Sequence, residues 1–259
     1  MKIDLTGRTA VVTGGSKGIG LATVRELVDG GATVITGALG ASPEIKELTR
    51  DGRVVFTEVD LSDPQGPAQL IGAAGPRVDI LVNNVGSAHP RPGGFLSITD
   101  DDWATSLTLN LMAAVRTTRA ALPAMLDAGS GAIVMTCSVN ARLPDPAVLD
   151  YSAAKAALAA FAKALSKEVG PRGIRVNTVS PGPVATDLWL GHNGVAETIS
   201  QATGAKPADI ESQAAAGSVT GRFSQPVEVA SLIGYLASDL AANITGADFT
   251  IDGGLIPTW

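Results

Sequence analysis

The sequence has 259 residues, 45% hydrophobic and 17% charged, which is enough apolar material for one large core, so we expect a single domain over residues 1–259. A formal net charge of −6 without a basic cluster argues against nucleic acid or an anionic membrane as the main partner. The single cysteine, Cys137, excludes an internal disulfide. His89 and His192 have no neighbours at a metal-ligand spacing, so we expect no metal site.

The sequence indicates neither a membrane span nor a secretory signal. No apolar stretch is long enough and free enough of charge to cross a bilayer. The first residues run directly into a strand-like segment, without an apolar core followed by a small-residue cleavage site. We therefore expect a cytoplasmic protein.

Short apolar runs rich in β-branched residues alternate with amphipathic helical stretches along the whole chain. Near-continuous apolar strands separated by helices are typical of a parallel sheet that is covered on both faces. The pattern predicts an α/β fold, a doubly wound Rossmann-type sheet with helices on both faces. The expected strands are residues 9–14, 32–37, 53–60, 79–84, 131–138, 174–180 and 247–252.

A glycine-rich loop, TGGSKGIG at 13–20, follows the first expected strand and opens the first expected helix. Gly14, Gly18 and Gly20 allow a tight turn and a close backbone approach to a pyrophosphate, whose charge is met by N–H groups at the helix start. A tight strand-to-helix turn without any ligand is the alternative. Because the loop begins a long α/β alternation, the context favours dinucleotide binding, with Ser16, Lys17 and Ile19 in the same loop.

The end of the second expected strand, TGALGAS at 36–42, bears on the choice of nicotinamide cofactor. An acid there would bind a ribose 2′-hydroxyl, and an arginine would bind a 2′-phosphate, but the segment contains neither. Lys17 can meet a 2′-phosphate as a point charge, and Ser16 or Ser42 can add a hydroxyl. We therefore favour NADP(H), while the missing arginine leaves NAD(H) open.

Thr99 followed by Asp100, Asp101 and Asp102 could be taken as the start of a helix or as a metal site. Acidic residues after a threonine cap complement the helix dipole, so we interpret the segment as a helix start.

The stretch YSAAK at 151–155 puts Tyr151 and Lys155 on one face of a helix. An ammonium, together with the positive nicotinamide of an oxidised cofactor, favours phenolate and lowers the tyrosine pKa, which makes Tyr151 a candidate general acid and base. Ser138 ends the fifth expected strand, where its hydroxyl can hold a substrate oxygen near Tyr151. A surface Tyr/Lys pair on an alanine-rich packing helix is the alternative explanation.

One segment, residues 188–220, interrupts the alternation of strands and helices after the sixth strand. Open sheets place ligand lids after the carboxyl ends of strands, so we expect a substrate lid here. Its apolar residues predict a largely apolar pocket with a few polar anchors. These residues are Leu188, Trp189, Leu190, Val195, Ile199 and Ile210.

Motifs in order along nearly the whole chain resemble the classical short-chain dehydrogenase/reductase family. They are TGGSKGIG at 13, VDL at 59, NNVG at 83, Asn110, Ser138, YSAAK at 151, SPGPVAT at 180, GRFSQPVEVA and ITGADFTIDGG. The resemblance implies an NAD(P)(H)-dependent oxidoreductase that transfers a hydride between nicotinamide and a ketone or secondary alcohol. The three residues between Tyr151 and Lys155 are similar to carbonyl reductases rather than to enoyl reductases of the wider family.

The resemblance also implies roles for individual residues. Asn110 would order a water linked to Lys155, although its amide could equally cap a helix irregularity, and Lys155 would bind the nicotinamide ribose. Val85 stands where the family usually has alanine, and Cys137, where it often has serine, is expected to be a small packed residue. The implied cofactor contacts are Asp60 and Leu61 at the adenine, Asn84, Val85 and Gly86 near the adjacent ribose, and Pro181, Gly182, Val184 and Thr186 at the nicotinamide.

Two functions and one assembly remain as expectations. The first function is the oxidoreductase, and the alternative is a dinucleotide-binding regulatory or scaffolding protein without turnover. By analogy with the family, and because alanines on the helix around 153–162 allow close approach of another helix, we expect a homo-oligomer, specifically a tetramer.

Overall fold

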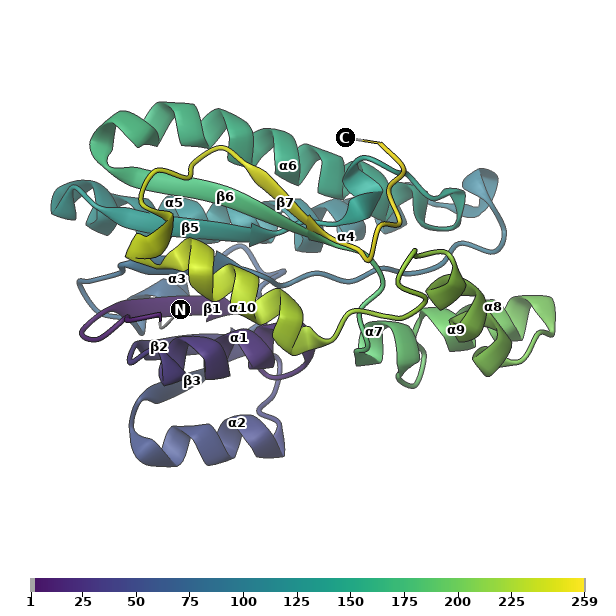
Figure 1. Ribbon diagram of the computed structural model, residues 1–259, viewed down its shortest axis with the longest axis horizontal. Coiled ribbons are helices and arrows are strands. Elements are labelled where there is room, and N and C mark those ends of the chain that lie inside the picture. The colour runs from purple at the N-terminus through teal and green to yellow at the C-terminus, as the bar shows by residue number, and fades with distance from the viewer. Residues whose placement is uncertain (1–2, 259) are drawn as a thin grey trace.

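The computed structural model describes residues 3–258, so residues 1, 2 and 259 of the expected domain lie outside the described residues. A seven-stranded sheet with the order β3-β2-β1-β4-β5-β6-β7 forms its centre, and every pairing is parallel (Figure 1). All seven expected strands are confirmed, with ends that differ by a few residues. They are β1 (Thr9–Thr13), β2 (Thr33–Ala38), β3 (Val54–Glu58), β4 (Ile80–Asn83), β5 (Gly131–Thr136), β6 (Ile174–Pro181) and β7 (Asp248–Ile251).

Helices cover both faces of the sheet, as the doubly wound pattern predicts (Figure 1). On β1, Val12 points into the core under α1, α2 and α10, and Val11 points into the core under α3, α5 and α6. This alternation explains why the central strands are apolar along their whole length. The helices are α1 (Gly18–Asp29), α2 (Pro43–Leu48), α3 (Gly66–Gly72), α4 (Asp100–Leu107), α5 (Ala113–Ala128), α6 (Leu149–Val169), α7 (Asp187–Leu190), α8 (Val195–Thr203), α9 (Pro207–Ala216) and α10 (Pro226–Ala237).

The start of α4 is fixed by hydrogen bonds between Thr99 and Asp102. The Thr99 side chain accepts a hydrogen bond from the Asp102 N–H at 3.1 Å, and the Asp102 carboxylate accepts one from the Thr99 N–H at 2.9 Å. This reciprocal pair is a capping box at the start of α4, so the interpretation of the three aspartates as a helix start is confirmed.

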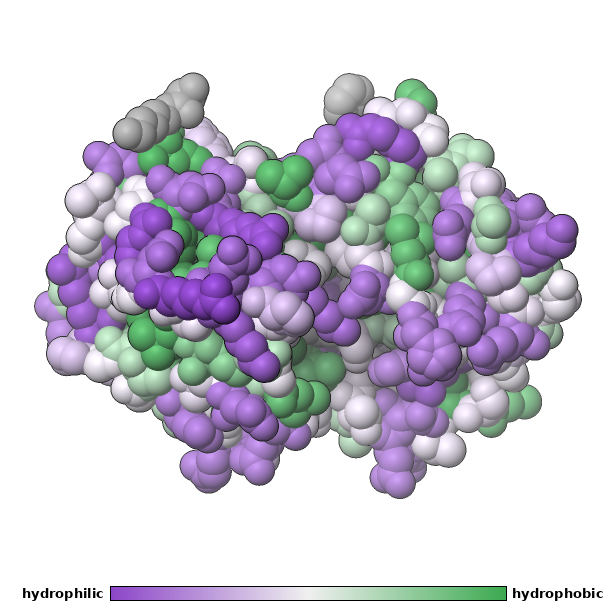
Figure 2. Space-filling model, turned by 90° about the horizontal axis from the view of Figure 1, so that it is seen from below, coloured by the Kyte–Doolittle hydropathy of each residue, from purple (hydrophilic) through white to green (hydrophobic). Residues whose placement is uncertain are grey.

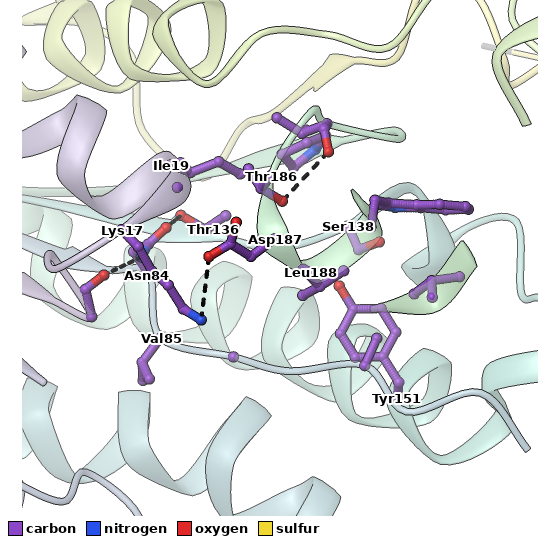
Figure 3. Close-up of a pocket in the computed structure, with 18 of the residues that line it drawn as sticks. Lys17, Ile19, Asn84, Val85, Thr136, Ser138, Tyr151, Thr186, Asp187 and Leu188 are labelled. Carbon is purple, nitrogen blue, oxygen red and sulfur yellow. Dashed lines mark hydrogen bonds and ion pairs between the residues drawn. The ribbon is translucent and has the colours of Figure 1, made fainter. Parts of the chain in front are cut away.

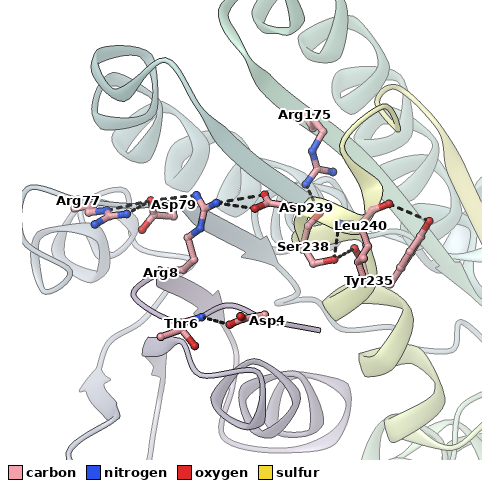
Figure 4. Close-up of polar contacts among 10 residues, drawn as sticks. All are labelled: Asp4, Thr6, Arg8, Arg77, Asp79, Arg175, Tyr235, Ser238, Asp239 and Leu240. Atoms are coloured by element: carbon pink, nitrogen blue, oxygen red, sulfur yellow. Dashed lines mark hydrogen bonds and ion pairs between the residues drawn. The ribbon is translucent and has the colours of Figure 1, made fainter. Parts of the chain in front are cut away.

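A network of ion pairs links segments at the amino-terminal edge of the sheet (Figure 4). The Arg8 guanidinium lies 3.0 Å from the Asp239 carboxylate and 3.9 Å from that of Asp79. Arg77 also contacts Asp79, at 2.9 Å. Because ligands of open α/β sheets collect at the opposite, carboxyl edge, we assign these contacts to stability.

The strand order reverses between β1 and β4, which pair directly although two other strands lie between them in the sequence. In doubly wound sheets the two connections leave this point in opposite directions and open a crevice beyond the strand ends. The glycine loop, the segment after β4 and residues 137–151 all reach that edge. Within residues 3–258, no helix is both long and apolar enough to span a membrane.

Candidate active site

The glycine loop after β1 is shaped for close backbone approach. Gly14 and Gly18 have φ values of 71° and 56°, in the left-handed region that glycine adopts without strain. A Cβ on Gly20 would lie 2.1 Å from the Gly14 carbonyl oxygen, so the third glycine packs α1 against the loop. The first turn of α1 holds no acidic side chain. Its N–H groups therefore fit a pyrophosphate, and the residues present suit a bound dinucleotide.

The segment after β4 is held against the glycine loop by Thr13. The Thr13 hydroxyl accepts hydrogen bonds from the N–H groups of Asn84 at 2.8 Å and Val85 at 3.0 Å. The Asn84 amide donates to the Thr13 carbonyl at 3.1 Å. These bonds give the two loops at the reversal point a fixed separation, and Val85 lines the cleft there while its side chain points away from the glycine loop (Figure 3) and packs against the core.

A cleft of about 930 Å³ occupies the carboxyl edge of the sheet. Figure 2 shows it as a hollow between the body of the sheet and the segment that carries α7, α8 and α9. Of the expected site residues, all but Gly20 and Asn110 line this cleft; those two are buried behind it. The lining set is Gly14, Ser16, Lys17, Gly18, Ile19, Asp60, Leu61, Asn84, Val85, Gly86, Ser138, Tyr151, Lys155, Pro181, Gly182, Val184 and Thr186.

Ser138, Tyr151 and Lys155 meet at the centre of the cleft. Tyr151 and Lys155 lie one turn apart on α6, and the Ser138 and Tyr151 hydroxyls point toward each other (Figure 3). Lys155 is 3% exposed, and its ammonium donates a hydrogen bond to the Thr136 carbonyl oxygen at 2.8 Å. The Ser138 hydroxyl accepts a hydrogen bond from the Asn140 N–H at 3.1 Å, which fixes its position beyond β5.

The pKa of Tyr151 differs from the expectation. The sequence predicts that the neighbouring ammonium and an oxidised nicotinamide lower it, but in the protein alone burial raises the pKa of Tyr151 to about 12, with the Ser138 hydroxyl acting in the opposite direction. Burial also lowers the pKa of Lys155. Removal of the phenol from water penalises phenolate more than the protein's own groups favour it, and the effect of an oxidised nicotinamide stays a prediction.

Asn110 lies in a single π-helical turn, η3 (Thr108–Met112), between α4 and α5. Its amide nitrogen donates to the carbonyl oxygens of Ser87 at 2.9 Å and Ser106 at 3.0 Å, and its oxygen accepts from the Ser87 N–H at 3.1 Å. Asn110 thus bridges the helix irregularity and the segment after β4. A Cβ on Gly86 would lie 2.7 Å from the Asn110 side-chain oxygen and 3.2 Å from the Lys155 side-chain nitrogen. Only glycine at this position lets the backbone pass so close to both side chains.

At the adenine end, Asp60 and Lys17 have partners within the protein. The Asp60 carboxylate accepts hydrogen bonds from the Ser62 hydroxyl at 2.7 Å and N–H at 2.8 Å, which lower its pKa. Lys17 is 72% exposed and points toward Asp187, with Nζ 3.8 Å from the carboxylate (Figure 3). Ser42 accepts a hydrogen bond from the Ile45 N–H as the cap of α2.

The segment after β6 forms three short helices, α7, α8 and α9, beside the cleft. Leu188, Trp189, Val195 and Ile199 line the cleft, whereas Leu190 and Ile210 do not. The Trp189 ring packs edge-on against Phe223, with ring centroids 5.3 Å apart.

Several contacts at the site were missed by the sequence analysis. Arg91, on the segment after β4, donates to the buried Asp150 carboxylate at 2.6 Å and to Asp102 at 2.8 Å, and so ties that segment to the first turn of α6. Asp145 also lines the cleft. No spacing rule identifies these residues, because their partners come from distant parts of the chain. Cys137 is 2% exposed, as expected of a small packed residue, although it also lines the cleft.

Comparison with known proteins gives a consistent family assignment. The family model described as short chain dehydrogenase matches residues 8–193. The oxidoreductase UcpA of Escherichia coli is 36% identical over 96% of this chain and 95% of its own length, and the 3-oxoacyl-[acyl-carrier-protein] reductase FabG of Chlamydia pneumoniae is 33% identical over 98% and 99%. The crystal structure of L-sorbose reductase from Gluconobacter frateurii, complexed with NADPH and L-sorbose, superposes with a TM-score of 0.90 at 30% identity over the full length of both chains. This chain belongs to the short-chain dehydrogenase family and is a nicotinamide-dependent oxidoreductase.

Proposed function

We propose that the protein reduces a ketone to a secondary alcohol with NADPH, and catalyses the reverse oxidation with NADP⁺. The observation that carries this proposal is the meeting of a tyrosine, a serine and a buried lysine in a cleft that continues from the glycine loop. A bound NADPH supplies the hydride that adds to the carbonyl carbon. The protein's own side chains then have to position the carbonyl and deliver a proton to its oxygen.

Tyr151 is the proposed proton donor. Its raised pKa keeps the phenol protonated at neutral pH, and a developing alkoxide is a stronger base than phenolate, so proton transfer to the substrate oxygen is favourable. Ser138 is proposed to donate a second hydrogen bond to the same oxygen, which stabilises the developing charge. In the oxidative direction the same two groups would accept the proton and hold the alcohol oxygen.

Lys155 and Asn110 are proposed to support Tyr151 and the cofactor. The Lys155 ammonium, held by the Thr136 carbonyl, has two N–H donors left for ribose hydroxyls. Asn110 fixes the Ser87 backbone and lies behind Gly86, close to the Lys155 ammonium. A water between the Asn110 oxygen and Lys155 would complete a path for proton resupply.

Preference for NADP(H) is supported by the charges around residues 38–42. The segment at the end of β2 carries no acid that would repel a 2′-phosphate. Lys17, exposed and only loosely paired with Asp187, can turn toward that phosphate. The L-sorbose reductase structure contains NADPH, which agrees with this choice. The cofactor contacts of the remaining lining residues, from Gly14 to Thr186, are proposed on the same basis.

Three further expectations belong to the proposal. Residues 188–220, with α7, α8 and α9, serve as a substrate lid because their apolar side chains form one wall of the cleft. A homotetramer and a cytoplasmic location remain expectations from the sequence. Light scattering at micromolar concentration tests the assembly, and a monomer would reject it.

The test of the proposed function is NADPH oxidation by the purified protein in the presence of a panel of uncharged ketones, followed by nicotinamide absorbance. Turnover of at least one ketone is expected. Cofactor binding without turnover across the panel would instead favour a dinucleotide-binding protein without catalysis.

A further inference from the structure

The part of the cleft beyond Tyr151 has mostly apolar walls. Leu188 lies next to the Tyr151 ring in Figure 3, and Trp189, Val195 and Ile199 continue the same wall. Leu255, after β7, also lines the cleft. These side chains suit the hydrocarbon part of a substrate and cannot bind a charged group.

Three carboxylates line the cleft: Asp60, Asp187 beside Lys17, and Asp145. Asp145 lines the cleft, and its Oδ1 accepts a hydrogen bond from the Ala147 N–H at 2.8 Å. The backbone N–H of Asp145 and the side-chain amide of Asn140 both donate to the Ser152 hydroxyl, each at 3.4 Å. The Ser152 side chain therefore bridges Asp145 and Asn140. Asn140 in turn contacts Ser138. The Asp145 backbone is therefore near the reacting end of the cleft, and its exposed carboxylate caps η5 (Pro146–Val148) beside it.

Among the described residues that line the cleft, no positive side chain pairs with Asp145. Among the described residues that line the cleft, the only lysines are Lys17 at the glycine loop and Lys155 beneath the nicotinamide position, and arginine and histidine are absent from the lining. The nearest guanidinium groups in sequence are paired with other carboxylates. Arg91 is bound to Asp150 at 2.6 Å, and Arg142 is bound to Asp248 at 2.9 Å.

From this distribution of charge we infer that the substrate is an uncharged ketone or secondary alcohol, and that Asp145 is a specificity residue that excludes anionic substrates. The second oxygen of Asp145, which has no hydrogen-bond partner in the described part of the chain, is available to a substrate hydroxyl. A carboxylate or phosphate at the same place would meet a like charge without a compensating cation. The inference rests on the proposed ketone reduction and deepens it.

The experiment uses two probes with the same reacting ketone, ethyl acetoacetate and acetoacetate, with NADPH at low ionic strength. We expect kcat/KM to favour the neutral ester in the unaltered protein. Asp145→Asn keeps the size and the Ala147 hydrogen bond of the side chain but removes its charge. It should raise kcat/KM for acetoacetate by about tenfold, the effect of one partly screened charge, and leave the ester within about twofold.

A matched control is Asp209→Asn, on α9 of the lid. Asp209 is exposed and does not line the cleft, so this variant changes the net charge equally and should leave the ratio of the two probes unchanged. Added salt should raise acetoacetate turnover in the unaltered protein but not in Asp145→Asn, because only the former has a charge to screen.

Equal use of both probes by the unaltered protein, or an unchanged ratio in Asp145→Asn, would overturn the inference while leaving ketone reduction intact. If neither probe is turned over although other uncharged ketones are reduced, the comparison is made with one of those ketones and its carboxylate analogue, under the same criteria. Absence of turnover with every ketone would instead overturn the proposed function.

Discussion

The Lys155 ammonium lies 5.6 Å from the centroid of the Tyr151 ring, and it donates a hydrogen bond to the Thr136 carbonyl oxygen. The cation therefore acts on Tyr151 through space, over the ring face. In the protein alone burial raises the pKa of Tyr151 to about 12. The proposed role of Lys155 is therefore to hold the nicotinamide ribose and, together with an oxidised nicotinamide, to lower the tyrosine pKa.

Substitution of Lys155 should damage cofactor binding and turnover together. Lys155→Ala removes the ammonium next to Gly86 and leaves the Thr136 carbonyl without its donor, so NADPH affinity should fall at least about tenfold and turnover by about a hundredfold. Lys163→Ala, on an exposed part of the same helix, is the control. Fluorescence titration and steady-state kinetics measure both effects. A change confined to thermal stability would support the simple surface-pair interpretation.

Substitution of Lys17 should alter cofactor selectivity. Lys17→Ala removes the cation proposed to meet the 2′-phosphate, so NADPH affinity should fall by about tenfold while NADH affinity stays the same. Lys167→Ala changes the net charge equally, far along α6, and should alter neither. Equal losses for both cofactors, measured by nicotinamide fluorescence, would show that Lys17 contacts something other than the 2′-phosphate.

The capping box at α4 should make the stability of the fold depend on acid pH. Hydrogen bonds from Thr99, with a further one from Arg91, lower the pKa of Asp102 to about 2. An unfolded aspartate titrates near 3.9, so the unfolded state binds more protons between these values. The stabilisation is therefore fully present above about pH 4 and is lost as the pH falls toward 2.

Thermal unfolding of Asp102→Asn tests this dependence. The difference in Tm between the unaltered protein and Asp102→Asn should be largest above about pH 5 and should shrink as the pH falls toward about 2. Asp101→Asn removes a charge from the same helical turn without touching the capping box, and its Tm difference should stay small. A constant Tm difference for Asp102→Asn across this range would mean that the capping box does not depend on the Asp102 charge.

The sequence predicts much of this fold because its signals are local. The β-branched runs match all seven strands, and Thr99 with Asp102 indicates the start of α4 from a few residues. The glycine loop is equally local, since its function depends on backbone shape at Gly14 and Gly18. These features need no knowledge of distant contacts.

What the sequence could not predict depends on partners that are remote in the chain. The link from Asn110 to Ser87 spans 23 positions, and that from Arg91 to Asp150 spans 59. The sequence did not show that burial raises the pKa of Tyr151 in the protein alone, because burial is a property of the packed cleft. The direction of Lys17 toward Asp187 likewise follows from the fold of the segment after β6.

The central claim is that Tyr151 delivers the proton in NADPH-dependent ketone reduction. The most direct measurement compares NADPH oxidation by the unaltered protein, Tyr151→Phe and Tyr235→Phe on one ketone that the protein reduces. Tyr235 lies on α10, outside the cleft lining, and is the matched control. The account predicts unchanged NADPH binding in all three and a loss of turnover of about a thousandfold in Tyr151→Phe alone. Near-normal turnover by Tyr151→Phe would contradict it.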